Sequence, residues 1–158
     1  MTPREYLEAV VRPNVADFHN HFADLRLAHN AVSAVDALAA YLFVWAHSNA
    51  PAAVASAKDD SHYRETLAKR DRSFALLRDI AKALKHVHLT RHNPQVAHAD
   101  QVTSRAIGYG EGGYGEGHFG GVEQVVVDVS AGDFSYLENI VDNGLAFLEA
   151  EMGSLGVP

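Results

Sequence analysis

Apolar residues recur every three or four positions over much of the chain, which is the period of an amphipathic α-helix. One such pattern predicts a long helix that Asn14 caps and that runs to about His47. Its apolar stripe comprises Phe18, Phe22, Leu25, Val32, Val35, Leu38, Leu42 and Trp45. A second helix is predicted from Asp71 or Ser73 to about Leu89. Its stripe, which we expect to pack against the first, comprises Phe74, Leu77, Ala81 and Leu84.

A short helix is predicted at the start of the chain. Thr2 and Glu5 have the spacing of a capping box, and Pro3 suits the first helical position. We expect this helix to end near Arg12, because Pro13 disfavours helical geometry in the residue before it.

The pattern changes twice farther along the chain. Residues 51–70 predict one or two short helices with a break near Asp59–Asp60. Residues 101–107 and 122–129 have the composition of strands. The segment between them, 108–121, repeats GYGEG and is too rich in glycine to be helical. We therefore predict a β-hairpin over 101–129 with a glycine-rich tip at 108–121.

A last helix is predicted from Asp133 or Ser135, with Glu138 in the capping-box position and Gly153 at its end. Its apolar face comprises Leu137, Ile140, Val141, Leu145, Leu148 and Met152. The fold class is thus mainly α, a bundle of four to six helices with a small β-hairpin before the C-terminal helix. At 158 residues, the chain is expected to form a single helical domain over 1–158.

Composition narrows the classes of protein that fit. The chain is 47% apolar and 21% charged, as in folded soluble proteins, and it has no cysteine. Disulfides, thiol chemistry and cysteine-ligated zinc are therefore excluded. We expect no signal peptide, and we interpret the apolar segment 31–46 as too short to span a bilayer. A cytoplasmic location is the expectation.

Charge is distributed unevenly along the chain. Residues 58–105 carry ten Lys/Arg and six Asp/Glu, a net of +4, whereas residues 106–158 carry none and nine, a net of −9. The middle segment favours an anion, and the C-terminal third would repel nucleic acid. The simpler interpretation, which we prefer, is that the two parts attract each other within the fold.

Polar residues within the apolar helices suggest a pocket. His29 and Asp36 are seven residues apart and therefore share one face of the long helix. Asp is seldom buried unless it is paired. Arg78, Lys82 and Lys85 form a cationic stripe on the partner helix, beside His86, and we predict that Asp36 pairs with one of the three. The pair either fixes helix register or belongs to a polar, anion-binding pocket between the helices.

Ten histidines raise the question of a metal. Asp17, His21 and Asp24 have the i, i+4, i+7 spacing of ligands on one helical face, and His86 could complete the set. Acidic residues are also favoured in the first turns of any helix, and histidines such as His98 suit an exposed helix exit. We therefore expect no metal and no other cofactor.

The glycine-rich tip has two interpretations. It is either a flexible loop or a partner-contact arm whose aromatic anchors are Tyr109, Tyr114 and Phe119. It is not a phosphate-binding loop, because it lacks the GxxxxGK[ST] pattern and any lysine.

The phrases LRDIAKALKH at 77–86 and RLAHNAVSAVDALA at 26–39 resemble uncharacterised bacterial helical proteins related to the HEPN group. Active members of that group are typically metal-independent ribonucleases, often in toxin or phage-defence systems. Their hallmark is Arg followed by a polar residue, with four to six residues between the Arg and a His. Arg78 and His86 are separated by seven residues, outside that range, whereas Arg91 and His98 are separated by six residues that include Pro94. The resemblance implies His98 as general base and Arg91 as the cation that stabilises the phosphorane.

The leading hypothesis is a non-enzymatic helical protein that acts by association, as a homodimer or with another protein, through its hairpin and glycine-rich arm. The alternative is a HEPN-type metal-independent ribonuclease or toxin component, with RNA as its ligand. The third is a metal-binding helical bundle. No membrane is expected to be involved.

Overall fold

The computed structural model describes residues 1–90, 94–108, 121–130 and 133–158. The chain is mainly helical, with a small antiparallel sheet before the C-terminal helix, as the sequence predicts. Its elements are α1 (Pro3–Tyr6), a π-helical turn η1 (Leu7–Val11), α2 (Arg12–Asn20), α3 (Leu25–Asn49), α4 (Pro51–Val54), α5 (Asp60–Arg70), α6 (Arg72–His86), a 3₁₀ turn η2 (Ala99–Gln101), β1 (Val102–Ala106), β2 (Glu123–Ser130), β3 (Asp133–Tyr136) and α7 (Leu137–Leu155).

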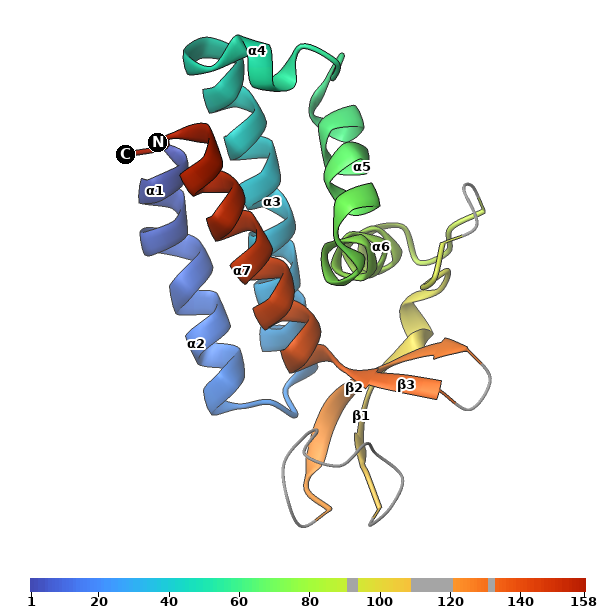
Figure 1. The fold of residues 1–158 in the computed structure, drawn as a ribbon. Helices are drawn as coiled ribbons and strands as arrows, with labels where there is room; N and C mark the ends of the chain where they lie inside the picture. The colour runs from blue at the N-terminus through green and yellow to red at the C-terminus, as the bar shows by residue number, and fades with distance from the viewer. Residues whose placement is uncertain (91–93, 109–120, 131–132) are drawn as a thin grey trace.

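The long helix α3 lies at the centre of the arrangement. It contacts α2 and α7 on one side and α5 and α6 on the other, and the sheet lies at one end of the helices (Figure 1). The α3–α6 contact predicted from their apolar stripes is confirmed. The largest fully buried side chains include Phe18, Leu38, Leu42, Phe74 and Leu77, which come from both predicted stripes.

By length and hydropathy alone, α3 is long and apolar enough to cross a membrane, contrary to our interpretation of its apolar segment as too short. Half of its most apolar window is buried inside the protein. The core helix of a globular fold has the same property, so the helix is weak evidence for a membrane span.

The start of the chain is helical for longer than predicted. Thr2 and Glu5 form the expected capping box, with Glu5 N–H donating to Thr2 Oγ1 at 3.2 Å. The predicted stop near Arg12 is wrong, because the helix passes through Pro13 by way of the π-helical turn η1. A π turn changes the hydrogen-bond ladder to i→i+5, which accommodates a residue that has no N–H.

The predicted helix from Asn14 to His47 is two helices. Asn14 does not cap it, since its side-chain amide donates to Val10 O at 2.8 Å within the preceding turn. Helix α2 ends at Asn20, and the Asp24 carboxylate caps α3 by accepting from the backbone N–H groups of Arg26 and Leu27, at 2.8 and 3.1 Å.

The break predicted near Asp59–Asp60 is confirmed. Asp59 caps α5 and Asp71 caps α6, each by accepting a backbone N–H two or three residues into the helix. Helix α6 ends at His86 and not near Leu89, because Val87 adopts φ 64° and ψ −40°.

The predicted pairing of the two strands is confirmed as β1 and β2, from Val102 opposite Val127 to Ala106 opposite Glu123. The sequence pattern did not predict β3, which pairs antiparallel with β2. The last helix therefore starts at Leu137, and the starts predicted at Asp133 or Ser135 are wrong. Cross-strand pairing decides this segment in preference to its capping-box spacing.

Candidate functional site

A polar groove of about 1070 Å³ lies between α5, the C-terminal half of α6 and the segment that follows α6. These elements lie together on the side of the molecule opposite α1 and α2 (Figure 1). We call it the α5–α6 groove; its lining is Lys58, Asp59, Ser61, His62, Glu65, Ala68, Lys69, Arg78, Asp79, Lys82, His86, His88, Leu89, Thr90 and Pro94.

Two cationic side chains of α6 line the groove one helical turn apart. Asp71 caps α6 and so fixes where its turns begin, and the i, i+4 spacing then places Arg78 beside Lys82. Arg78 Nε is buried and has no hydrogen-bond partner among the described residues. Burial, followed by the charge of Arg78, lowers the pKa of Lys82. Two like charges at this spacing, partly withdrawn from water, form a site that an anion would stabilise.

The carboxylates of the groove have other partners. Asp79 Oδ2 accepts from Gln95 N–H at 2.9 Å, and Asp59 accepts from His62 N–H at 2.7 Å. Glu65 lies 3.6 Å from Lys69 Nζ. Within the part of the chain that the structure describes, neither Arg78 nor Lys82 forms a salt bridge with a carboxylate.

Two histidines lie at the far end of the groove because the backbone reverses at Val87. In a continuing helix His86 and His88 would lie about 200° apart around the axis, since each residue turns about 100°. Here His88 N–H donates to His86 O at 2.7 Å across Val87, and both histidines line the groove. The backbone then pairs with residues farther on, through Leu89 N–H to Ala97 O at 2.7 Å.

His98 is brought beside this end of the groove. It forms an isolated antiparallel bridge with His88, and the centroids of the two rings are 4.1 Å apart. Both side chains are exposed. Arg91 lies outside the described residues, so the predicted catalytic pair of Arg91 and His98 stays a prediction.

The polar pocket predicted between α3 and α6 is only partly assembled. Arg78, Lys82 and His86 line the groove, whereas Lys85 and His29 are exposed and do not. The α5 side of the groove was not predicted, although His62, Glu65 and Lys69 have the i, i+3, i+7 spacing of one helical face.

Asp36 pairs with a different helix from the one that the sequence pattern predicts. Its Oδ2 lies 2.7 Å from Arg64 Nη1 on α5, so the predicted pair with Arg78, Lys82 or Lys85 is wrong. Helix α3 contacts both α5 and α6, and periodicity alone does not say which neighbour supplies the cation.

The charge of Asp36 is only partly compensated by this pair. Burial raises the pKa of Asp36, although Arg64 and, more weakly, Arg78 and Lys82 lower it. Its Oδ1 is buried and has no hydrogen-bond partner among the described residues. The carboxylate is therefore close enough to act electrostatically on the groove cations without pairing with them.

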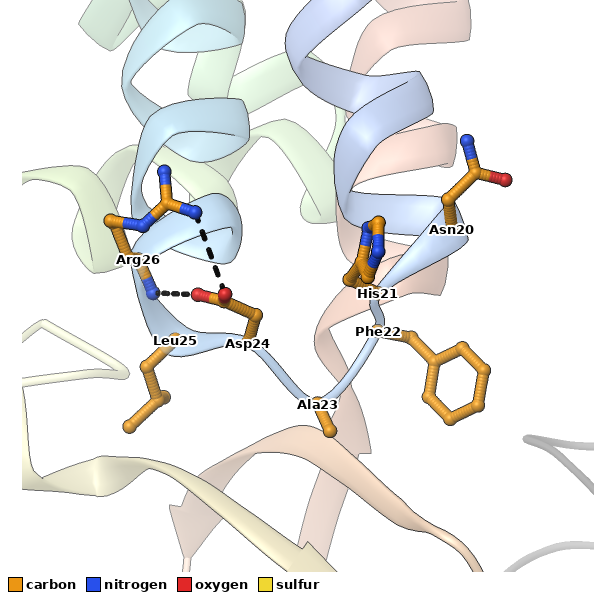
Figure 2. Close-up of a pocket in the computed structure, with 7 residues that line it drawn as sticks. All are labelled: Asn20, His21, Phe22, Ala23, Asp24, Leu25 and Arg26. Atoms are coloured by element: carbon orange, nitrogen blue, oxygen red, sulfur yellow. Dashed lines mark hydrogen bonds and ion pairs between the residues drawn. The ribbon is translucent and has the colours of Figure 1, made fainter.

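The candidate metal-ligand face at Asp17, His21 and Asp24, which we did not favour, does not form on one helix, because α2 ends before His21. In Figure 2 the Asp24 carboxylate is directed to Arg26, and the His21 ring lies on the other side of the loop, where Nδ1 is 3.1 Å from Asp17 O. The loop lines a pocket of about 600 Å³. Among the residues with described positions, no group of three or more His, Asp or Glu side chains is placed to hold a metal.

Ion pairs within the fold join part of the basic middle segment to the acidic C-terminal third. Arg70 binds the carboxylate of Glu151 at 2.8 Å, and Glu151 is only 7% exposed; Arg105 pairs with Asp128 at 2.8 Å. Both pairs join the basic middle segment to the acidic C-terminal third. The attraction that we preferred therefore exists, but Arg78 and Lys82 take no part in it.

The predicted contact residues Tyr109, Tyr114 and Phe119 lie outside the described residues. Comparison with protein-family models, with curated proteins and with solved structures finds no match to this chain.

Proposed function

We propose that the protein binds a ribonucleotide phosphate, in an RNA strand or a free nucleotide, in the α5–α6 groove. Arg78 and Lys82 hold the phosphate. The observation that carries the proposal is that these two adjacent cations have no carboxylate partner among the described residues, while the groove carboxylates are engaged elsewhere.

The chemistry of the two side chains suits phosphate. The guanidinium of Arg78 offers donors in a planar fork, and Lys82 adds a compact positive charge beside it. The groove volume, about 1070 Å³, matches a nucleotide-sized ligand. The ribose part of the proposal comes from the resemblance to HEPN-like proteins, whose active members cleave RNA.

Binding is tested with a short fluorescent RNA by anisotropy at about 0.15 M salt, where the Debye length is about 8 Å, with AMP as competitor. Lys82→Gln and Arg78→Gln should each weaken binding about tenfold or more, because a hydrogen bond to a charged group contributes about 1.5–3 kcal/mol. Lys85→Gln is the matched control: it removes the same charge from the same helix outside the groove, and it should change the affinity less than about twofold, as a screened surface charge does.

Three results are informative. Equal losses from Lys82→Gln and Lys85→Gln, or no binding of RNA or AMP by the natural chain, would contradict the proposal. AMP that binds as tightly as RNA would identify the ligand as a free nucleotide. RNA cleavage in the presence of EDTA, if lost in His98→Ala, would extend the function to the ribonuclease that the resemblance implies.

Association through the sheet is a second candidate, favoured by a separate observation. Ile107, Val126 and Tyr136 are buried and form an apolar cluster apart from the main core, with Phe134 packed against it, so the sheet has a small core of its own and its edges remain the surfaces open to a partner. The sheet lies at one end of the helices, and β1 and β3 are its edge strands (Figure 1). Edge strands offer unpaired backbone groups to a second chain. We propose a homodimer formed on this sheet, with the oligomeric state as its test.

A further inference from the structure

The turn after α6 contains the one non-glycine residue with a positive φ among the described residues, Val87. Val87 has φ 64°, a region that β-branched residues seldom adopt. The turn closes with a hydrogen bond from His88 N–H to His86 O, and Ala99 N–H donates to Val87 O at 3.0 Å. Strain of this kind persists only where the surrounding structure imposes it, and it gathers at functional sites.

The consequence of the turn is a row of basic groups along the groove. His86 follows Lys82 by one helical turn, about 6 Å along the axis. His88 lies beside His86 only because of the reversal at Val87, and the ring of His98 contacts His88. The groove thus continues from the cations Arg78 and Lys82 to histidines, a residue type that ordinarily gains a proton between pH 8 and 5.

The charged groups around these histidines come from three elements. Helix α6 supplies Lys82, Lys85 and Asp79, whose carboxylate is held by Gln95 N–H. Helix α5 and its cap supply Lys58, Asp59, His62, Glu65 and Lys69. The turn η2, which contacts α6, contains Asp100. Among these, the acids nearest the groove are engaged by backbone N–H groups or by Lys69, so an added proton on His86 or His88 is free to act on a ligand.

We propose that His86 and His88 form a second phosphate subsite of the groove, next to Lys82, which binds phosphate only when the histidines are protonated. The inference rests on the proposed function and names its ligand class more closely: a ribonucleotide chain with two successive phosphates. The ring of His98, whose centroid is 4.1 Å from that of His88, lies beside this subsite.

The affinity for a short RNA without terminal phosphates is measured from pH 8 to 5.5 at constant ionic strength. The charge of a phosphodiester does not change in this range, so a pH dependence comes from the protein. The natural chain should bind about tenfold more tightly at pH 5.5 than at pH 8. This is the change expected when RNA binding is coupled to the uptake of one proton and raises the pKa of the group that takes it up by about one unit. His88→Gln and His86→Gln should each lose most of this change, and His29→Gln, exposed on α3, should keep it.

A second measurement does not depend on the variants. In proton NMR, the ring signals of His86 and His88 should titrate at higher pH in the RNA complex than in the free protein. Two results would overturn the second subsite and leave the proposed function intact, provided that Lys82→Gln still abolishes binding. The first is an affinity of the natural chain that does not change with pH, and the second is a pH dependence in His88→Gln equal to that of the natural chain. Absence of binding at every pH would overturn both.

Discussion

Arg64 holds a buried carboxylate, and its removal should be more damaging than removal of the carboxylate itself. Its Nη1 lies 2.7 Å from Asp36 Oδ2, and its Nη2 lies 2.6 Å from Asp60 Oδ2. The side chains of Asp36 and Arg64 are 16% and 22% exposed, whereas that of Asp60 is 41% exposed. In Arg64→Leu, the Asp36 carboxylate therefore stays buried and loses the donor that binds it.

The magnitude follows from this asymmetry. Removal of one partner of a buried ion pair destabilises a protein by about 3–5 kcal/mol. Because both side chains keep some exposure, we expect about 3 kcal/mol for Arg64→Leu at neutral pH. Asp36→Asn leaves Arg64 paired with Asp60 and leaves an amide oxygen to accept from it, so we expect a loss of about 1 kcal/mol or less.

The effect of pH has a definite sign. Burial raises the pKa of Asp36, so the folded chain holds this proton more tightly than the unfolded chain. The stability from this group is fully present below the unfolded pKa of about 3.9 and is lost as pH rises through the folded pKa. Without Arg64 the folded pKa rises further. The loss caused by Arg64→Leu should therefore shrink as the pH falls from neutral toward that range.

The assay is urea denaturation followed by circular dichroism at pH 7.5 and pH 5. The natural chain, Arg64→Leu, Asp36→Asn and the double variant form a double-mutant cycle. The double variant should be more stable than Arg64→Leu at pH 7.5, because it removes the unpaired charge. A loss below about 1 kcal/mol for Arg64→Leu, or a double variant no more stable than Arg64→Leu, would refute the reasoning.

Two further predictions concern the turn and the sheet. Val87→Gly should raise the free energy of unfolding by about 0.5–1 kcal/mol, because glycine adopts φ 64° without strain; a lower urea midpoint would contradict this. Sedimentation should show a dimer for the natural chain, and a monomer would contradict association through the sheet. A variant with residues 108–121 shortened should stay a dimer if the sheet alone forms the contact, and it should become a monomer if the glycine-rich arm is required.

The signals that predicted structure correctly are local ones. The Thr2–Glu5 capping box, the break near Asp59–Asp60 and the strand composition of 122–129 each depend on residues within a few positions of one another. Local signals failed where a distant segment competed. Pairing with β2 makes Asp133–Tyr136 a strand, although Ser135 and Glu138 have capping-box spacing.

In the candidate site, too, local sequence signals place residues of one helix correctly but do not predict which distant segments lie opposite them. Helical period alone is enough to place Arg78, Lys82 and His86 near one another. It does not place α5 opposite them, because the register between two helices depends on how their side chains pack. It does not place His88 beside His86, since the residues HVHLT contain no sequence signal for the reversal at Val87. Backbone hydrogen bonds with Ala97 and Ala99 hold that reversal in place.

The sequence by itself determined that the chain forms amphipathic helices followed by a hairpin, because hydrogen bonding and apolar period act over a few residues. Only the tertiary structure decided that Asp36 binds Arg64, and that Arg78 and Lys82 line a groove without a salt bridge to a carboxylate among the described residues. The physical reason is that a buried charge pairs with whichever cation the packing brings within reach, and packing is a property of the whole chain.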